Sequence, residues 1–186
     1  MRSRWIQALC LSVILVRGAL TAEPDAKSVQ KVKSQSSATT DWPRWRGPKA
    51  DGIADGRNLA IQWSQTKNVR WSVKLPGWGT SSPVVHKSRV YVTSETEKDG
   101  KKSLLTLCFD RETGKELWRD DFGFGVDQKT YDKSNLAVNT PAVTDDAVYV
   151  AFGNSDIAGY THDGTLLWVH RYMQSFGDPK MSWGYG

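Results

Sequence analysis

One pattern occurs twice in this chain, and it restricts the possible folds more than any other feature. A Ser/Thr-Pro-apolar segment is followed four residues later by a Val-Tyr-Val segment, at residues 82–85 and 90–92 and again at residues 140–143 and 148–150. The second copy follows the first at a constant offset of 58 residues. Repetition at a fixed period is typical of a fold assembled from equal structural units.

A second set of residues repeats at a shorter offset. Leu107, Gly114 and Trp118 return 50 residues later as Ile157, Gly164 and Trp168. We expect the eight-residue difference to fall in one hairpin loop, which runs from residue 94 to 103 in the first copy and from 153 to 156 in the second. Because the spacing of the apolar positions is kept while this loop varies, the loop is predicted to lie at the surface.

Partial copies flank the two full ones. Trp71 lies 47 residues before Trp118, and the Trp-Gly-Tyr-Gly segment at 183–186 parallels the Gly-Trp-Gly segment at 77–79. The sequence is therefore expected to hold about two and a half units of about 50 residues each. We expect the natural protein to continue with another Ser/Thr-Pro-apolar segment and to reach at least about 350 residues, as six to eight units require.

Short runs rich in Val, Tyr, Thr and Trp predict the secondary structure. No sustained helical period is present, so the fold class is all-β. A four-stranded unit of this length, repeated, is typical of a β-propeller of four-stranded antiparallel blades, here incomplete. The predicted strands cover residues 69–75, 82–86, 89–94, 103–109, 115–120, 140–144, 147–152, 156–161 and 165–171.

The residues that recur have structural roles in such a blade. Trp71, Trp118 and Trp168 are predicted to fill the wedge between neighbouring sheets, since a large flat side chain buries much apolar surface there. Gly114 and Gly164 are predicted to supply the positive φ of a tight turn. The side chains expected to bond the backbone amides of these turns belong to Asp110, Thr113 and Asp163.

The chain is predicted to have four parts. Residues 1–22 read as a signal peptide, with Arg2 and Arg4, an apolar run of about 12 residues that is too short to span a membrane, and a cleavage site near Ala22. Residues 23–40 are predicted to be a flexible linker and residues 41–68 an ordered N-terminal arm. Residues 69–186 are predicted to form the incomplete propeller. We therefore expect an exported protein, periplasmic or extracellular, with no membrane span after cleavage.

Charge and cysteine content exclude several functions. The predicted signal peptide carries three Arg and no acid, which leaves 22 basic and 20 acidic residues, so no nucleic-acid partner is expected. Cleavage also removes Cys10 and leaves Cys108 alone, which excludes an internal disulfide and a cysteine zinc site. His86, His162 and His170 are scattered, and no pair has the spacing of metal ligands.

The two copies resemble a known repeat. SSPVV…VYV followed by LCFDRETGKELW, with the weaker TPAV…VYV and THDGTLLW, resembles the pyrroloquinoline-quinone (PQQ) type of β-propeller repeat over about residues 41–186. The second copy departs from it, with Tyr160 where Asp110 stands and Asp163 where Thr113 stands, so its hairpin is expected to lack one capping interaction.

The resemblance implies two different functions. Some relatives are quinoprotein dehydrogenases that hold PQQ over a calcium ion with a vicinal cysteine pair, a stacking Trp and Glu, Asn and Asp ligands. Others, similar to the outer-membrane assembly propeller, hold no cofactor and act as binding scaffolds. This chain has no adjacent cysteines and no recognisable calcium-ligand motif, so no catalytic residue, metal or cofactor is predicted.

Our first interpretation is a non-catalytic scaffold that binds a protein or glycan partner. The alternatives are a PQQ- and calcium-dependent dehydrogenase whose active residues lie in missing blades, and a product that cannot close and has no function. Long aromatic connections after two strands are expected to lie on one rim, where they either bind the partner or pack over the blade ends. The candidate rim residues are Phe122, Phe124, Tyr131, Tyr172, Phe176 and Trp183.

Overall fold

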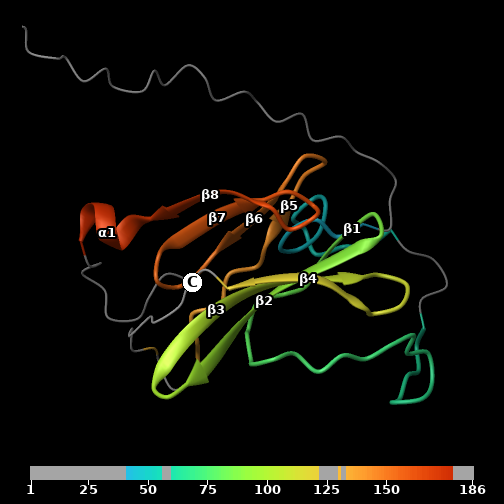
Figure 1. Cartoon of the computed structure of the whole chain (residues 1–186). Coiled ribbons are helices and arrows are strands. Elements are labelled where there is room, and N and C mark those ends of the chain that lie inside the picture. Colours follow the sequence, from blue (N-terminus) through green and yellow to red (C-terminus); the bar gives the residue numbers. More distant parts are fainter. Residues whose placement is uncertain (1–40, 56–59, 122–129, 131–132, 178–186) are drawn as a thin grey trace, which may run out of the picture. The chain divides into compact units, whose positions relative to one another are not determined.

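A computed structural model describes residues 41–55, 60–121, 130 and 133–177, and within these ranges the chain forms two four-stranded antiparallel sheets (Figure 1). The strand orders are β1-β2-β3-β4 and β5-β6-β7-β8, so each sheet is a meander in which successive strands are neighbours. The predicted all-β class with four-stranded antiparallel units is confirmed. The signal peptide and linker predicted for residues 1–40 lie outside the described residues.

The strands follow the predicted runs closely, with two exceptions treated below. In the first sheet they are β1 (Val84–His86), β2 (Arg89–Lys98), β3 (Lys101–Asp110) and β4 (Glu116–Asp121). In the second sheet they are β5 (Ala142–Val143), β6 (Val148–Ala151), β7 (Asp156–Tyr160) and β8 (Leu166–Arg171). One short helix that the sequence did not predict, α1 (Tyr172–Phe176), follows β8. Within the described ranges, no helix is long and apolar enough to cross a membrane.

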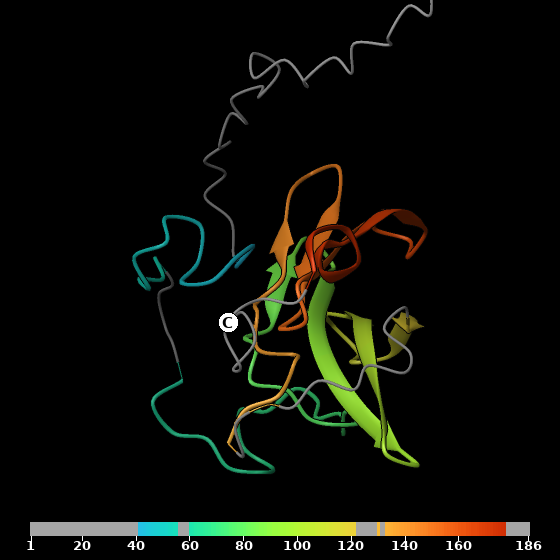
Figure 2. The ribbon, with the colours of Figure 1, turned by 90° about the vertical axis from the view of Figure 1, so that its left-hand side faces the viewer.

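The prediction of a surface loop at residues 94–103 is wrong. β2 and β3 stay paired from Ser94↔Leu105 to Lys98↔Lys101, and the chain reverses at Asp99 and Gly100. These two residues have φ values of +53° and +72°, which a two-residue hairpin of type I′ requires and which an Asp-Gly pair adopts readily. The resulting long hairpin projects past the second sheet (Figures 1 and 2).

The register of the strands corrects the alignment of the two copies. Val84, Tyr91, Cys108 and Trp118 form one row across the first sheet, and Ala142, Tyr149, Gly159 and Trp168 form the matching row across the second. The offset is therefore 58 at the tyrosines, 51 at Cys108 and Gly159, and 50 at the tryptophans. Ala158, not Ile157, is equivalent to Leu107.

The β3–β4 turn is one residue longer than the β7–β8 turn, and this difference explains why the offset between the copies changes. The Gly114 amide donates to the Asp110 carbonyl four residues back, whereas the Gly164 amide donates to the Thr161 carbonyl three residues back. The first turn is thus one residue longer, and Thr161, not Tyr160, stands where Asp110 stands. In the second turn the Thr161 hydroxyl accepts from the Thr165 amide at 3.1 Å, but the bonds that Asp110 and Thr113 make to the first turn have no counterpart there, which agrees with the expected loss of a capping interaction.

The main hydrophobic core lies between the two sheets. Tyr91, Leu104 and Cys108 of the first sheet pack with Phe152 and Tyr160 of the second, and all five side chains are fully buried. Strand alternation places these residues on the facing surfaces of the sheets. A smaller core on the other face of the first sheet consists of Val92, Leu105, Leu107 and Phe109, with Leu75 and Val90 packed against it.

The strand predicted for residues 69–75 is not formed. This segment alternates polar and apolar residues, but within the described part of the chain it has no neighbouring strand to bond. Backbone pairing starts only at Trp78, whose amide and carbonyl bond with those of Glu95 at 3.0 and 2.8 Å. A Cβ atom on Gly77 would lie 2.0 Å from the Glu95 carbonyl oxygen, so this close approach requires glycine.

The first described part of the N-terminal arm, residues 41–55, bonds to both sheets. The Trp42 amide donates to the Val85 carbonyl at 2.8 Å, and the Val85 amide donates to the Trp42 carbonyl at 2.9 Å. The next residue, Pro43, accepts from the Val143 amide at 2.9 Å. Since Val85 belongs to β1 and Val143 to β5, two consecutive arm residues connect the first strands of the two sheets.

Candidate functional site

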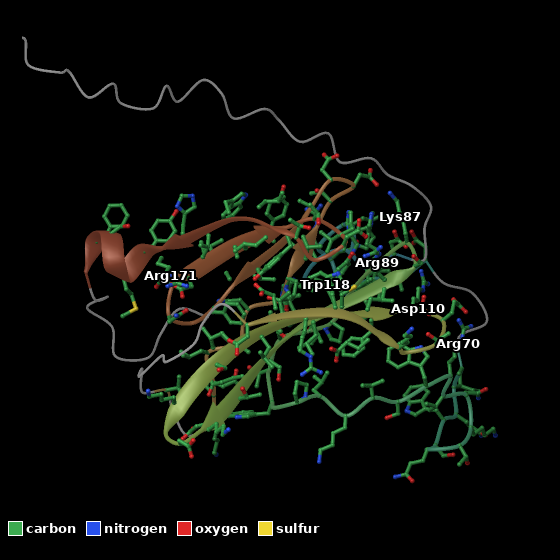
Figure 3. All side chains as sticks on the ribbon, in the orientation of Figure 1. Arg70, Lys87, Arg89, Asp110, Trp118 and Arg171 are labelled. Carbon is green, nitrogen blue, oxygen red and sulfur yellow. The ribbon has the colours of Figure 1, made fainter. Side chains whose placement is uncertain are left out.

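Two tryptophans pack on the glycine of a following turn. The Trp118 indole N–H donates to the His162 carbonyl at 2.8 Å, and a Cβ atom on Gly164 would lie 2.7 Å from the indole ring. Trp71 repeats this arrangement, with its N–H 2.8 Å from the Arg111 carbonyl and its ring 2.6 Å from the Cβ position of Gly114. The side chain of Trp118 thus reaches from β4 to the second sheet (Figure 3).

Trp168, the third predicted inter-blade residue, lies differently. Its side chain is 38% exposed, and its indole rests on Gly159 of its own sheet. Its ring centroid lies 6.2 Å from that of Tyr149 and 5.4 Å from that of His170. Within the described ranges, no turn glycine covers it.

The predicted turn residues form hydrogen bonds at both hairpins. In the first turn, Asp110 Oδ1 accepts from the Thr113 amide at 2.8 Å, from the Thr113 hydroxyl at 2.7 Å and from the Glu112 amide at 3.1 Å. These bonds, above all the one from the Thr113 hydroxyl, lower the pKa of Asp110 below its usual value. In the second turn, Asp163 instead bonds Arg89 of the first sheet at 2.8 Å.

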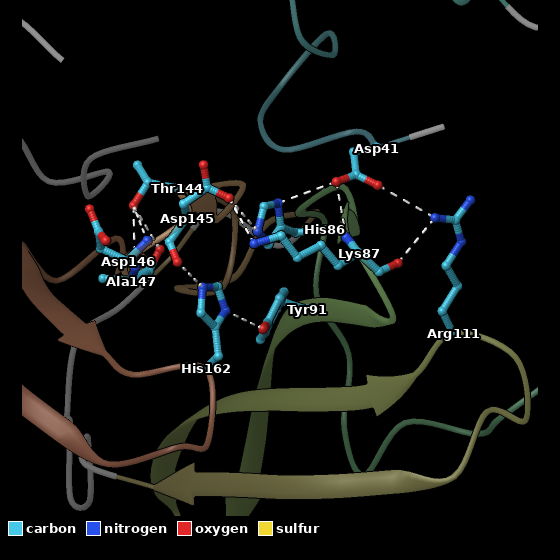
Figure 4. Close-up of polar contacts among 10 residues, drawn as sticks. All are labelled: Asp41, His86, Lys87, Tyr91, Arg111, Thr144, Asp145, Asp146, Ala147 and His162. Carbon is cyan, nitrogen blue, oxygen red and sulfur yellow. Dashed lines mark hydrogen bonds and ion pairs between the residues drawn. The ribbon is translucent and has the colours of Figure 1, made fainter. Parts of the chain in front are cut away.

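The structure brings together two histidines that the sequence left scattered (Figure 4). His86 is the last residue of β1, and His162 lies in the β7–β8 turn. Their rings stack with centroids 5.2 Å apart and planes 16° apart. The Tyr91 hydroxyl lies 2.7 Å from His162 Nδ1, and His162 Nε2 lies 3.1 Å from the Asp145 carbonyl. No local sequence signal marks this pair, because the contact is formed only when the two sheets pack.

Charged residues from three parts of the chain surround the histidine pair. Asp41 of the arm lies 3.3 Å from His86 Nδ1 and 3.5 Å from Arg111, and it accepts from the Lys87 amide at 3.0 Å. Asp145 of the second sheet lies 2.8 Å from Lys87 Nζ and 3.6 Å from His86 Nε2. The arm and both sheets therefore meet at one polar junction (Figure 4).

The protonation equilibria at this junction are shifted by their surroundings. Burial, followed by the nearby Lys87 ammonium, lowers the pKa of His86. The hydrogen bond from Lys87 lowers the pKa of Asp145. Burial raises the pKa of Tyr91 and raises that of the Cys108 thiol to about 11. Tyr91 and Cys108 are thus neutral core residues near pH 7.

The two described residues of the predicted rim line part of a cavity. Tyr172 and Phe176 of α1 are 43% and 80% exposed, and their rings stack with centroids 5.8 Å apart. A cavity of about 400 Å³ opens beside them, and its walls also include Phe152, Ile157 and Met173. The other rim candidates, Phe122, Phe124, Tyr131 and Trp183, lie outside the described residues.

Two polar residues also line this cavity. Asn139 and Ser155 contribute to its lining, and the Ser155 hydroxyl is buried without a hydrogen bond. Elsewhere in the part of the chain that the structure describes, no three His, Cys, Asp or Glu side chains gather in a way that could hold a metal ion.

Comparisons with known proteins identify the repeat. The profile of the family described as outer membrane protein assembly factor BamB matches residues 52–170. No curated protein matches the chain in sequence. Two solved structures align with low scores. They are BamB from Moraxella catarrhalis, at 13% identity, a TM-score of 0.28 and coverage of 49% of this chain, and a europium-containing methanol dehydrogenase, at 16% identity, a TM-score of 0.25 and coverage of 50%.

The alignments span 34% and 26% of those two proteins. The family profile, in contrast, spans more than half of this chain and includes both four-stranded sheets, which confirms the resemblance to the PQQ-type propeller repeat. The chain therefore belongs to the PQQ-like β-propeller family described as outer membrane protein assembly factor BamB.

Proposed function

We propose that this protein is an exported, non-catalytic propeller scaffold that binds a segment of a partner protein at the rim beside α1. The observation that carries this proposal is the aromatic cavity of about 400 Å³ lined by Tyr172, Phe176 and Phe152. Binding sites commonly combine apolar walls with a few polar groups that fix orientation. The unbonded Ser155 hydroxyl and Asn139 supply that polar part.

The chemistry of the cavity favours a protein partner over a glycan. Its apolar walls fit a large apolar side chain, and its polar groups fit the backbone of an extended segment. The family description, an outer membrane assembly factor, supports a partner in the cell envelope. The predicted signal peptide at residues 1–22 supports export to the periplasm or beyond.

The polar groups at the junction and at the second turn have structural partners. His162, Asp145 and Asp41 bond across the junction of the arm and the sheets, and Asp163 bonds Arg89. These contacts hold the sheets together, whereas the exposed rings of Tyr172 and Phe176 line the cavity beside α1. The distribution of contacts supports a binding role for the rim.

Photo-crosslinking in the exporting cell tests the proposal. A photoreactive phenylalanine analogue at position 172 or 176 is expected to form a defined adduct with an envelope protein. The same analogue at Lys115, an exposed position in the β3–β4 turn, is the matched control and is expected to form none. Equal adducts at all three positions, or none at any, would contradict a binding rim.

A second assay separates the scaffold from the dehydrogenase alternative. The whole natural protein is supplied with PQQ and calcium and is offered alcohols and sugars. A scaffold is expected to give no quinone-linked oxidation. Calcium-dependent turnover would replace our proposal with the quinoprotein alternative, in which PQQ would be the cofactor.

A further inference from the structure

We propose that the adjoining edges of β1 and β5 form a binding site for an extended acidic segment of a partner protein, and that the N-terminal arm closes this site in cis through residues 41–43. The site is separate from the rim beside α1, so it does not depend on the function proposed for that rim. β1 and β5 approach each other, and each lies at the edge of its sheet. An edge strand offers backbone groups to which an incoming segment can bond.

The arm bonds to these edges as an extended segment would. Trp42 bonds Val85 of β1 through both its amide and its carbonyl, at 2.8 and 2.9 Å. The Pro43 carbonyl accepts from the Val143 amide of β5 at 2.9 Å. Proline has no amide hydrogen, so Pro43 brings no donor that would need a partner at β5. The backbone part of the site therefore requires one residue that pairs as in a strand, followed by a carbonyl acceptor.

Donors for a carboxylate lie next to these backbone groups (Figure 4). Asp41 accepts from the Lys87 amide at 3.0 Å. It also lies 3.3 Å from His86 Nδ1 and 3.5 Å from Arg111 Nη1. The side chains of Asp41 and His86 are only 13% and 11% exposed, and a carboxylate this buried requires such partners. The residue before the pairing position is therefore specified as acidic, which the covering of a sheet edge alone would not require.

The donors are held in place by the sheets rather than by the arm. Arg111 Nη1 donates to the Lys87 carbonyl at 3.1 Å. The His86 ring stacks on that of His162, which is itself hydrogen-bonded to neighbours in the two sheets. A site whose groups are already oriented loses little entropy when a ligand binds. The carboxylate site is thus prepared for a ligand before the arm occupies it.

The charges at the site favour an acidic occupant. Lys87 Nζ pairs at 2.8 Å with Asp145, which belongs to the second sheet. Arg111, in contrast, pairs with Asp41 of the arm. A segment that replaces the arm must therefore bring a negative charge of its own, because a charge that loses its partner away from bulk water is costly.

The attachment of the arm is small and separate from the core. No residue from 41 to 55 belongs to either hydrophobic core of the sheets. Within the described ranges, the hydrogen bonds of residues 44–55 join these residues to one another, as between the Gly47 amide and the Arg44 carbonyl at 3.0 Å. Residues 41–43 can thus detach without opening the core, which allows a partner segment to take their place.

A chain with a vacated site provides the test. In the whole chain, Asp41→Ala removes the carboxylate, and Trp42→Pro removes the amide that donates to Val85. A peptide of residues 41–55, acetylated at its N-terminus and labelled at its C-terminus, should bind this double variant saturably in fluorescence anisotropy. Binding to the wild-type chain should be at least about tenfold weaker, because the tethered arm competes at an effective concentration of about 1 mM.

Two altered peptides and one further measurement make the test specific. An Asp41→Asn peptide should bind at least about tenfold more weakly, since it cannot form the ion pair with Arg111. A Trp45→Ala peptide should bind unchanged, because Trp45 is 61% exposed in the arm. The amides of Val85 and Val143 should exchange hydrogen faster in the double variant than in the wild type, and the peptide should restore their protection.

The amides of the β2–β3 pair report whether the double variant is folded, because they should stay protected throughout. If they do not, Asp41→Asn in the whole chain takes its place with the same expectations. No saturable binding up to about 1 mM peptide, or equal binding of the Asp41→Asn peptide, would overturn the proposal. A wild-type dimer that Trp42→Pro abolishes would also overturn it, because the arms would then be exchanged between copies instead of closing the site in cis.

Discussion

Replacing Gly164 with alanine should measure the contact that joins the two sheets. Gly164 has φ +88°, and a Cβ atom there would lie 2.7 Å from the Trp118 indole. Gly100, in the β2–β3 turn, has φ +72° with nothing within 4 Å of its Cβ position. The two alanine variants therefore share the backbone strain and differ in the contact with Trp118.

The expected magnitudes follow from these two geometries. Placing an L-residue other than glycine in the left-handed region costs about 1–2 kcal/mol, which is the whole expected loss for Gly100→Ala. Crowding a well-packed side chain costs about 1–3 kcal/mol more. Gly164→Ala should thus lower the free energy of unfolding by about 2–5 kcal/mol. Gly114→Ala should behave like Gly164→Ala, since its Cβ would lie 2.6 Å from Trp71.

Urea denaturation of the four proteins, wild type and three variants, gives these differences from the transition midpoints if the slopes agree. A double-mutant cycle with Trp118→Ala isolates the crowding. Once the indole is removed, Gly164→Ala should cost no more than Gly100→Ala. Equal losses for Gly164→Ala and Gly100→Ala in the wild-type background, or a loss that persists without Trp118, would refute the reasoning.

Three further predictions concern the junction and the core. Burial lowers the pKa of His86 in the folded chain, so the unfolded chain binds more protons than the folded chain as the pH falls below about 6.5. The melting temperature should therefore fall from pH 7.5 to 5.5, and it should fall less in His86→Gln. An equal fall of the melting temperature in the wild type and in His86→Gln would contradict this. Cys108, with a pKa raised to about 11, should react with a disulfide reagent at pH 8 only as fast as the chain unfolds. Asp41→Ala should speed tryptic cleavage at Arg44 and Lys49 of the arm; an unchanged rate would show that these ion pairs do not hold the arm.

The sequence predicted the strands well where side-chain alternation and turn residues agreed. The Val-Tyr-Val segments lie near the start of β2 and form the first three residues of β6, where alternate residues face the core between the sheets. The segment 69–75 alternates in the same way but forms no strand. A strand needs a bonded neighbour as well as a pattern, and the pattern carries no information on the neighbour.

The repeat alignment failed by one residue for a related reason. When the two copies are aligned at Trp118 and Trp168, Gly114 and Gly164 match. The first turn is one residue longer, so every residue before it is shifted by one relative to its equivalent in the second copy. The pairs Cys108↔Trp118 and Gly159↔Trp168, which the structure provides, reveal the shift. Turn length is set by backbone hydrogen bonds, which the side-chain pattern does not encode.

The junction of the arm and the sheets was beyond sequence reasoning because its members come from distant parts of the chain. His86 and His162 are 76 positions apart, and their stacking depends on the angle at which the two sheets pack. Neither histidine shows a local spacing that marks a site. Their partners, Asp41 and Asp145, looked like ordinary turn or arm residues.

The contacts that fix the angle between the sheets lie at both edges of the first sheet. At β1, the arm bonds Val85 and Val143 through two consecutive residues. At β4, Trp118 bonds the turn that carries His162 and Gly164. One connection alone would leave the sheets free to rotate about it, whereas two at opposite edges prevent that rotation. The outward face of the second sheet, with Trp168, is therefore held in a defined orientation relative to the first sheet.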